Sequence, residues 1–299
     1  MANILEQFEG LPGLKLNETL KPFTTFNVGG PAKYFLETND ISLIQQSIKF
    51  ATAADIPWAP LGGGSNVIIS DSGYQGLIIK LSSVKCEVNS NLITADAGTN
   101  LARVVRSAIG KNLTGLEFAV GIPGTFGGAL AGNAGTSGKG IAELAREIQY
   151  ISSDGELHIA TPESLDVSYR YTRFKYSTTE IIIGGTLYLN TSEPQQIQSL
   201  VKEALHKRSW QPKGVWCAGC IFKNPANNFA GKLIQEVGLK GKKIGGAKVS
   251  ENHGNFIVNT GSATAEDIII LISLIKQQVR DKFGIQLEEE VRYLGFENN

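Results

Sequence analysis

The most informative stretch of this 299-residue chain is Trp58-Ala59-Pro60-Leu61-Gly62-Gly63-Gly64-Ser65-Asn66-Val67-Ile68-Ile69. Its two apolar runs, 58–61 and 67–69, are typical of short strands, and a glycine triplet lies between them. Successive glycines let backbone N–H groups converge on an anion such as a pyrophosphate, and the following Ser65 and Asn66 add side-chain donors. A tight turn between the two strands is the alternative interpretation.

Two better-known phosphate loops do not fit this stretch. The third glycine of a G-x-G-x-x-G fingerprint would fall on Val67, and a strand rather than a helix follows. The Gly-Lys-Ser/Thr ending of a P-loop is missing. The loop is therefore an anion-binding candidate outside both families.

A second glycine-rich region, Glu117-Phe118-Ala119-Val120-Gly121-Ile122-Pro123-Gly124-Thr125-Phe126-Gly127-Gly128-Ala129, continues to Asn133-Ala134-Gly135. So many small residues around three large apolar ones indicate backbone lying flat against a planar ligand. A glycine-rich segment that packs helices closely is the alternative.

The hydrophobic pattern on either side predicts a mixture of helices and strands. The helix over 193–209 is stopped by Trp210-Gln211-Pro212, so we expect two α+β domains, 1–208 and 209–299. Thr264 to Asp267 predicts a capping box at the start of a helix that runs to about Lys282. The other predicted helices are 40–55, 101–111 and 230–237, and the other predicted strands are 76–81, 85–88, 92–95, 148–152, 156–160, 180–189, 255–259 and 285–294.

Composition narrows the class of protein. Lys plus Arg (28) equals Asp plus Glu (28), which does not favour nucleic acid or an anionic membrane as a partner. The longest apolar run, Ile268–Ile275, is too short to span a bilayer, and Met1–Gly10 lacks the pattern of a signal peptide. Three cysteines are too few for a disulfide scaffold. We expect a reduced, cytoplasmic protein.

Taken together, the two glycine loops resemble the FAD domain of the vanillyl-alcohol-oxidase type. The resemblance implies an FAD-binding domain of two α+β subdomains, in which the first loop holds the pyrophosphate and the second lines the isoalloxazine. The FAD contacts that it implies are Leu61, Gly62, Gly63, Gly64, Ser65, Asn66, Gly121, Ile122, Pro123, Gly124, Gly127, Gly128, Asn133 and Ile183.

Three further segments are similar to the UDP-N-acetylenolpyruvoylglucosamine reductases, and to their shorter branch, which lacks an inserted tyrosine loop. They are Ser-Tyr-Arg-Tyr-Thr-Arg-Phe-Lys (168–175), Ala-Gly-Cys-Ile-Phe-Lys-Asn-Pro (218–225) and Leu-Glu-Glu-Glu-Val-Arg (287–292), and 231–247 and 255–259 also match. The resemblance implies that NADPH reduces FAD, and that the enolpyruvyl ether of UDP-N-acetylglucosamine then takes a hydride at C3 and a proton at C2. The product, UDP-N-acetylmuramate, is a peptidoglycan precursor. A monomer is the family expectation.

The resemblance also implies roles for single residues. Arg170 would stabilise the enolate-like charge, since a guanidinium binds a carboxylate bidentately, and Tyr169 would line the substrate. Glu290 would be the catalytic glutamate, although strand alternation alone does not separate it from Glu288. The alternatives are a surface ion pair for Arg170 and an exposed charged face for Glu290.

Cys220 occupies the proton-donor position, where the family commonly has serine. A thiol with a reference pKa of about 8.5 stays mostly protonated at neutral pH and is a better acid than an alcohol. Cys217 and Cys220 also form a C-x-x-C pair, which raises a redox or zinc alternative. A second pair and a suitably spaced histidine are missing, so we expect no metal.

Lys223 and Asn224 would contact the phosphates or sugar of the substrate. Arg208, Lys232 and Lys243 could add positive charge for the diphosphate, or be ordinary solvated side chains. Two other functions stay open at this point: an FAD-dependent sugar or alcohol oxidase of the same fold, and a flavin-binding redox sensor that uses the two cysteines.

Overall fold

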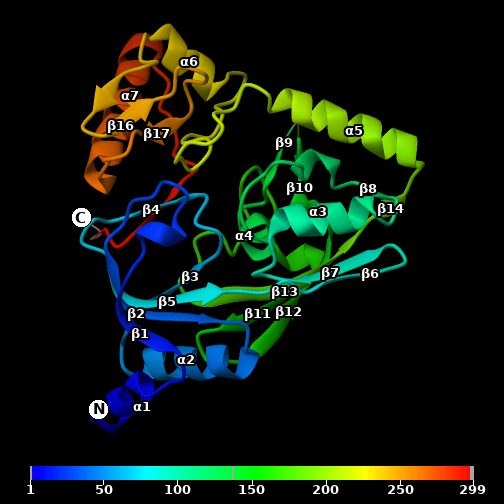
Figure 1. Ribbon diagram of the computed structural model, residues 1–299, viewed down its shortest axis with the longest axis vertical. Coiled ribbons are helices and arrows are strands. Elements are labelled where there is room, and N and C mark those ends of the chain that lie inside the picture. Colours follow the sequence, from blue (N-terminus) through cyan, green and yellow to red (C-terminus); the bar gives the residue numbers. More distant parts are fainter. Residues whose placement is uncertain (1, 137, 297–299) are drawn as a thin grey trace. The chain divides into compact units, whose positions relative to one another are not determined.

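A computed structural model of the chain describes residues 2–136 and 138–296 (Figure 1). The chain divides into two compact units. Unit 1 consists of Met1–Leu16, Tyr34–Gly63 and Gly76–Ser209, and unit 2 of Asn17–Lys33, Gly64–Gln75 and Trp210–Asn299. The chain passes from unit 1 to unit 2 for the last time between Ser209 and Trp210, one residue from the predicted domain boundary. Two short N-terminal segments, Asn17–Lys33 and Gly64–Gln75, also belong to unit 2. The assignment of 1–208 to FAD and 209–299 to the substrate stays a prediction.

Most of the first sheet belongs to unit 1, and its strand order is β1 (Leu14–Thr19), β2 (Pro31–Thr38), β5 (Tyr74–Leu81), β3 (Trp58–Leu61). β3 runs parallel to β5, with Leu61 opposite Lys80. The helices α1 (Ala2–Glu9) and α2 (Ile41–Ala53) lie beside this sheet (Figure 1). Asp40 begins α2 by accepting hydrogen bonds from the N–H groups of Ser42 and Leu43, because the first turn of a helix has unpaired N–H groups.

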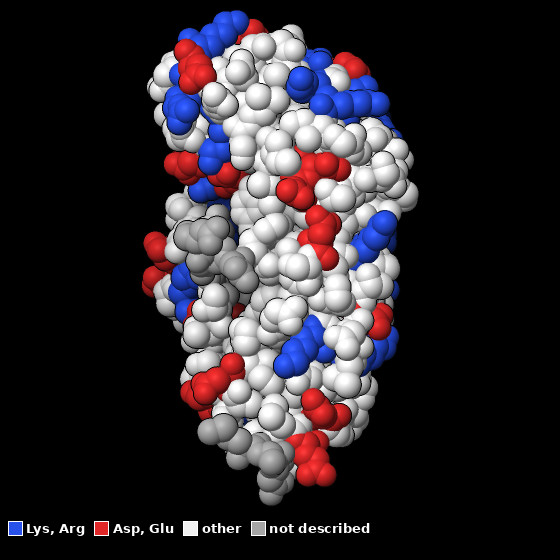
Figure 2. Space-filling model, turned by 90° about the vertical axis from the view of Figure 1, so that its left-hand side faces the viewer, with Lys and Arg blue, Asp and Glu red and all other residues white. Residues whose placement is uncertain are grey.

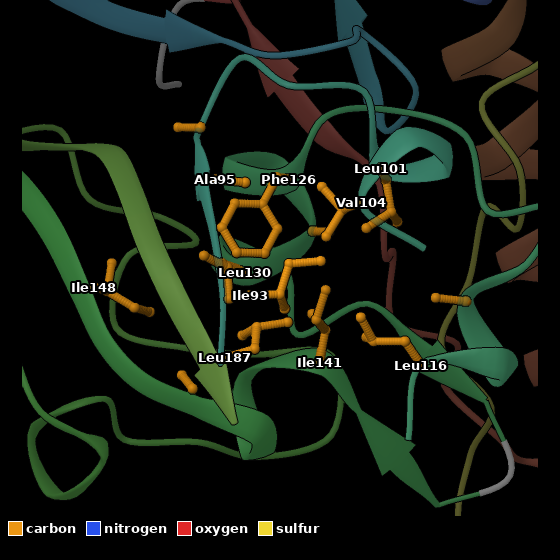
Figure 3. Close-up of a cluster of buried hydrophobic side chains, with 14 of the residues drawn as sticks. Ile93, Ala95, Leu101, Val104, Leu116, Phe126, Leu130, Ile141, Ile148 and Leu187 are labelled. Atoms are coloured by element: carbon orange, nitrogen blue, oxygen red, sulfur yellow. The ribbon is translucent and has the colours of Figure 1, made fainter. Parts of the chain in front are cut away.

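The second sheet is antiparallel, in the order β12 (Leu157–Ala160), β11 (Ala145–Ser152), β13 (Glu180–Tyr188), β7 (Leu92–Asp96), β6 (Cys86–Asn89). Side chains alternate between the two faces of a strand, and in β13 both faces are buried. Ile182 packs in one core with α3 (Leu101–Ile109) and α4 (Phe126–Ala131), whereas Ile181 and Ile183 pack in the core of the first sheet. The Phe126 ring lies in the middle of the α3–α4 core (Figure 3).

Shorter elements complete unit 1. Helix α5 (Pro194–Lys207) precedes the last crossing into unit 2. The two-stranded pairs are β8 (Leu113–Thr114) with β14 (Asn190–Thr191), and β9 (Gly135–Thr136) with β10 (Lys139–Gly140); the 3-10 turns are η2 (Glu117–Ala119), η3 (Ile141–Leu144) and η4 (Pro162–Ser164).

Unit 2 has its own core, built from all three of its chain segments. Phe26, Val28 and Ile68 from the two N-terminal segments are buried with apolar residues of the C-terminal segment. β4 (Val67–Ile69) pairs in parallel with β18 (Arg292–Leu294). The remaining elements are η1 (Lys21–Phe23), the helices α6 (Ala230–Glu236) and α7 (Ala265–Phe283), and a sheet of β15 (Lys243–Ile244), β16 (Ala247–Val249) and β17 (Ile257–Asn259).

The ends of α7 follow from local sequence. The predicted capping box is confirmed, because Thr264 and Asp267 exchange side-chain and backbone hydrogen bonds. Asp71, from another segment of unit 2, accepts hydrogen bonds from the N–H groups of Ala265 (3.0 Å) and Glu266 (3.1 Å). The helix ends at Gly284, whose φ of 68° is left-handed.

Two predicted strands are too long. Of 285–294 only Arg292–Leu294 is a strand, because only these residues find a continuous partner, β4; Glu289 makes an isolated bridge with Phe222. Of 255–259 only Ile257–Asn259 is a strand, since the N–H of Phe256 turns back to the oxygen of His253 (3.1 Å).

Charge is mixed at the surface as it is in the sequence. Blue and red side chains are interspersed over the face shown in Figure 2. Among the described residues, no helix combines the length and apolar character needed to cross a membrane.

Candidate active site

Within unit 1 the two predicted FAD loops are in direct contact. A Cβ at Gly62 would lie 2.6 Å from Thr125 Oγ1, and a Cβ at Gly63 would lie 2.7 Å from the Gly124 Cα. Any side chain at Gly63 would collide with backbone, so the close approach of the two loops requires glycine. The chain passes from unit 1 to unit 2 at the next residue, Gly64, whose φ of 61° also suits glycine.

The second loop is held along residues 97–101. The N–H groups of Phe126 and Gly127 bond to the oxygens of Thr99 (2.8 Å) and Ala97 (2.9 Å), and the Leu101 N–H bonds to the Gly124 oxygen (3.0 Å). Gly121 and Gly124 have φ values of 79° and 114°. A fixed backbone without side chains is what a loop against a planar ring requires, so these residues fit FAD.

Two residues that are predicted to contact FAD, Asn66 and Asn133, make hydrogen bonds within the protein. In unit 2 Asn66 Nδ2 donates to the backbone oxygen of Glu290 (3.1 Å), and the backbone oxygen of Asn66 accepts from the backbone N–H of Arg292 (3.0 Å). In unit 1 Asn133 is 4% exposed; its Nδ2 donates to the Ser168 oxygen (3.0 Å) and its Oδ1 accepts from the Ala142 N–H (3.0 Å).

Arg170 and Tyr169 form the tip of a tight turn in unit 1. Ser168 and Tyr171 exchange two backbone hydrogen bonds of 3.1 Å, which leaves Tyr169 and Arg170 as the two connecting residues. Tyr169 is 56% exposed, and the Arg170 guanidinium carbon lies 5.7 Å from its ring centroid. Arg170 has a φ of 58°. Arg170, predicted to bind the carboxylate, and Tyr169, predicted to line the substrate, therefore lie at the end of a fixed hairpin.

Unit 2 brings the Cys220 segment together with Glu290. The Glu290 N–H bonds to the oxygen of Ile221 (2.7 Å), the residue after Cys220, and the Lys223 N–H bonds to the Glu288 oxygen (2.9 Å). On its other edge Cys220 forms an antiparallel bridge with Phe256. The predicted proton donor and the predicted catalytic glutamate thus stand on neighbouring backbone segments.

The residue that fixes this arrangement, Asn255, had no assigned role in the sequence. It is 2% exposed. Its Oδ1 accepts from the Phe222 N–H (2.9 Å) and its Nδ2 donates to the Phe222 oxygen (2.8 Å), while its backbone oxygen accepts from Ile221 (2.9 Å). An asparagine at the start of the apolar run 256–258 was the signal, because a buried amide needs partners.

His253 forms a hydrogen bond with the backbone of Asn255. Its Nδ1 accepts the Asn255 N–H (3.1 Å), and its ring stacks on Trp210 at 4.1 Å and meets Phe256 edge-on. Burial, with the charge of Lys240 as a smaller cause, lowers the pKa of His253 to about 4. The imidazole is therefore neutral at physiological pH, as its acceptor role demands.

The two glutamates that precede Glu290 each form an ion pair. Glu288 pairs with the Lys223 ammonium (3.3 Å) and Glu289 with Lys276 (2.8 Å). Sequence alternation left Glu288 and Glu290 equivalent, and in the structure the Glu288 carboxylate is paired with Lys223.

Three other residues that are predicted to bind the substrate interact with residues of their own unit. Asn224 Oδ1 accepts the first N–H of α6, from Ala230 (3.1 Å). Arg208 donates to the Phe118 oxygen beside the second glycine loop (3.2 Å), and Lys232 lies 3.8 Å from Glu236.

The three cysteines, Cys86, Cys217 and Cys220, are free thiols. Burial raises the pKa of the Cys217 thiol, against the opposing effect of the Gly219 N–H, so Cys217 is a poor nucleophile at neutral pH. No group of three His, Cys, Asp or Glu side chains within 2–136 and 138–296 is arranged to hold a metal ion.

Comparison with known families agrees with this arrangement. Residues 32–161 match the family described as FAD binding domain, and residues 211–294 match UDP-N-acetylenolpyruvoylglucosamine reductase, C-terminal domain. The predicted fold class, an FAD-binding domain followed by a C-terminal α+β domain, is confirmed.

Individual relatives match along almost the whole chain. The UDP-N-acetylenolpyruvoylglucosamine reductase of Clostridium botulinum is 38% identical over 305 residues, covering 99% of this chain and 98% of the relative. UDP-N-acetylenolpyruvoylglucosamine reductase 2 of Bacillus cereus is 42% identical over 284 residues, covering 94% and 93%. A crystal structure of the Thermus caldophilus reductase superposes with a TM-score of 0.80 at 33% identity, covering 94% and 98%.

Proposed function

The chain belongs to the UDP-N-acetylenolpyruvoylglucosamine reductase family, and we propose that it reduces the enolpyruvyl ether of UDP-N-acetylglucosamine to UDP-N-acetylmuramate, with NADPH as the reductant. It is an FAD-dependent oxidoreductase of peptidoglycan synthesis. The observation that carries the assignment of the reacting groups is the backbone bond between Glu290 and Ile221, which sets Glu290 beside the Cys220 segment.

The reaction adds one hydride and one proton across the enolpyruvyl double bond. FAD, when bound and reduced, supplies the hydride that C3 receives. The Cys220 thiol donates the proton that C2 receives, and the thiolate is then reprotonated from solvent. Glu290 serves as the second acid–base group of this proton transfer.

Arg170 acts on the carboxylate of the substrate. Its guanidinium binds the carboxylate and stabilises the negative charge that develops when the hydride arrives at C3. Tyr169 lines the substrate beside it. Lys223 and Asn224 bind the phosphates or sugar, for which the Lys223 ammonium would exchange its exposed partner Glu288.

Anaerobic mixing tests the proposal. NADPH should bleach the flavin absorbance, and addition of UDP-N-acetylenolpyruvoylglucosamine should restore it with formation of UDP-N-acetylmuramate. If O₂ restores the absorbance quickly while the sugar nucleotide does not, the protein is an oxidase and the proposal is wrong. A redox sensor would instead show a response that a Cys217→Ser change alters.

A further inference from the structure

We propose that Lys175 is a positioning residue for Arg170, and that its ammonium holds the backbone conformation from which the guanidinium meets the substrate carboxylate. The inference rests on the proposed function for the role of Arg170. Lys175 belongs to the same motif as Arg170, yet the reaction as derived above gives it no task.

Lys175 is a buried cation. The residue is 2% exposed, although lysine is almost never fully buried unless its ammonium is paired. The Nζ donates to the Arg170 backbone oxygen at 2.8 Å, and the Lys175 N–H bonds to the Thr172 oxygen (2.9 Å), which closes the turn between the two residues. A charged donor makes a stronger hydrogen bond to a carbonyl than a neutral one.

Arg170, whose oxygen accepts this hydrogen bond, has an unfavourable backbone conformation. Arg170 has a φ of 58°, a left-handed conformation that a long L side chain rarely adopts because its Cβ crowds the following carbonyl. The direction of the Arg170 Cα–Cβ bond is fixed by the two peptide units that flank it. Lys175 anchors the one that contains the Arg170 oxygen, so loss of this bond would free that unit and, with it, the side chain.

The rest of the turn is tied to the end of the second glycine loop. Thr172 Oγ1 donates to the Ala131 oxygen (2.8 Å) at the last residue of α4, and Asn133 donates to the Ser168 oxygen (3.0 Å). These bonds place the hairpin relative to α4, and Lys175 orients its tip. A fault at Lys175 should therefore disturb the guanidinium and leave the FAD loop in place.

The experiment compares Lys175→Met and Lys175→Arg with Lys80→Met, a matched change of an ion-paired lysine in the same unit. Flavin reduced with dithionite is mixed with UDP-N-acetylenolpyruvoylglucosamine, and affinity for UDP-N-acetylmuramate is measured by calorimetry. A misplaced guanidinium should lower the reoxidation rate of Lys175→Met about 100-fold and weaken binding of the carboxylate product. FAD content should be normal, Lys175→Arg should recover part of the rate, and Lys80→Met should match the wild type.

A double-mutant cycle distinguishes positioning from a general structural role. In an Arg170→Ala background, Lys175→Met should cause no further loss, because the group that it orients is already gone. Additive losses, or a Lys175→Met protein with the wild-type rate, would overturn the inference. If Lys175→Met does not fold, Lys175→Gln, which keeps a donor without the charge, decides between the same outcomes. A wild-type protein that the sugar nucleotide does not reoxidise would instead refute the proposed function.

Discussion

Cys220 stands on backbone that is held on both edges. Phe256 bridges it on one side, and the bond from the Glu290 N–H reaches its neighbour Ile221 on the other. A thiol on such a fixed segment can be offered to one atom of a substrate, which is what a proton donor requires. Cys217, three residues earlier, has its pKa raised by burial, so little of it is thiolate at neutral pH.

We predict that Cys220→Ala separates the two halves of the reaction. Reduction of the flavin by NADPH should survive, while reoxidation by the enolpyruvyl substrate should fall by about 10²- to 10⁴-fold, since a positioned acid contributes that much. Cys220→Ser, which keeps an O–H at the same place, should retain most of the rate. Stopped-flow absorbance under anaerobic conditions measures both steps, and unchanged turnover of Cys220→Ala would remove Cys220 from the mechanism.

His253 should make stability depend on pH. Its pKa is lowered to about 4 by burial, whereas an unfolded histidine titrates near 6.5. Between these values the unfolded chain binds more protons, so the free energy of unfolding should fall as pH drops from about 6.5 to about 4. We expect a loss of roughly 2 kcal/mol from this group, after allowance for its partial exposure.

Urea titrations at both pH values measure the effect. His253→Gln should show a smaller pH dependence than the wild type. A His253→Gln protein with the full pH dependence would contradict the assignment.

At the scale of elements, α7 depends on a partner far away in the sequence. Its first two N–H groups are capped by Asp71, which lies almost two hundred residues earlier. An anion at a helix N-terminus satisfies unpaired donors and interacts favourably with the helix dipole.

We predict that Asp71→Ala lowers the free energy of unfolding by about 1–2 kcal/mol. Asp71→Asn, which keeps an oxygen acceptor without the charge, should lose less. Urea denaturation followed by circular dichroism measures both. Equal stability of Asp71→Ala and the wild type would show that the internal capping box of α7 suffices.

Local pattern predicted the elements whose cause is local. The helix that begins at Asp40, the hairpin strands β6, β7, β11 and β12, and the Thr264 box all follow from spacing and capping within a few residues. The strand expected over 285–294 was wrong for most of its length. The segment does alternate as predicted, with Leu287 and Val291 buried, but residues 285–291 lack a continuous partner strand. Pairing depends on residues elsewhere in the chain, and one sequence does not reveal it.

In the candidate site, too, some residues could be predicted from the sequence and others could not. Motif resemblance pointed to Arg170, Cys220 and Glu290, and the structure shows how each is held. Asn255 and Lys175 hold these segments through hydrogen bonds that form only in the folded chain. Asn66 and Asn133 were expected to meet the cofactor, and their bonds within the protein could not be read from a glycine-rich pattern.

At the scale of the whole molecule, unit 2 is assembled from three separate stretches of chain. Phe26, Val28 and Ile68 are buried in its core although they come from the N-terminal quarter of the sequence. Burial of one such side chain contributes about 1.5–3 kcal/mol. That is a large share of the roughly 5–15 kcal/mol by which a domain is stable.

We predict that a fragment of residues 210–299 does not fold alone. It would lack these core residues, the β4 partner of β18 and the Asp71 cap of α7. Urea titration followed by circular dichroism should give no cooperative transition for the fragment, whereas the full chain should give one. A sigmoidal transition with the helical signal of α7 would show that the C-terminal segment is self-sufficient.

The discontinuous make-up of unit 2 also sets an order of events on the ribosome. Its first two segments are complete at Gln75, but their remaining partners begin only at Trp210. At roughly 5–20 residues per second, the nascent chain waits on the order of ten seconds with Phe26, Val28 and Ile68 uncovered. During that interval the half-made protein displays apolar surface that a chaperone could bind, and the unit that carries Cys220 and Glu290 is the last to mature.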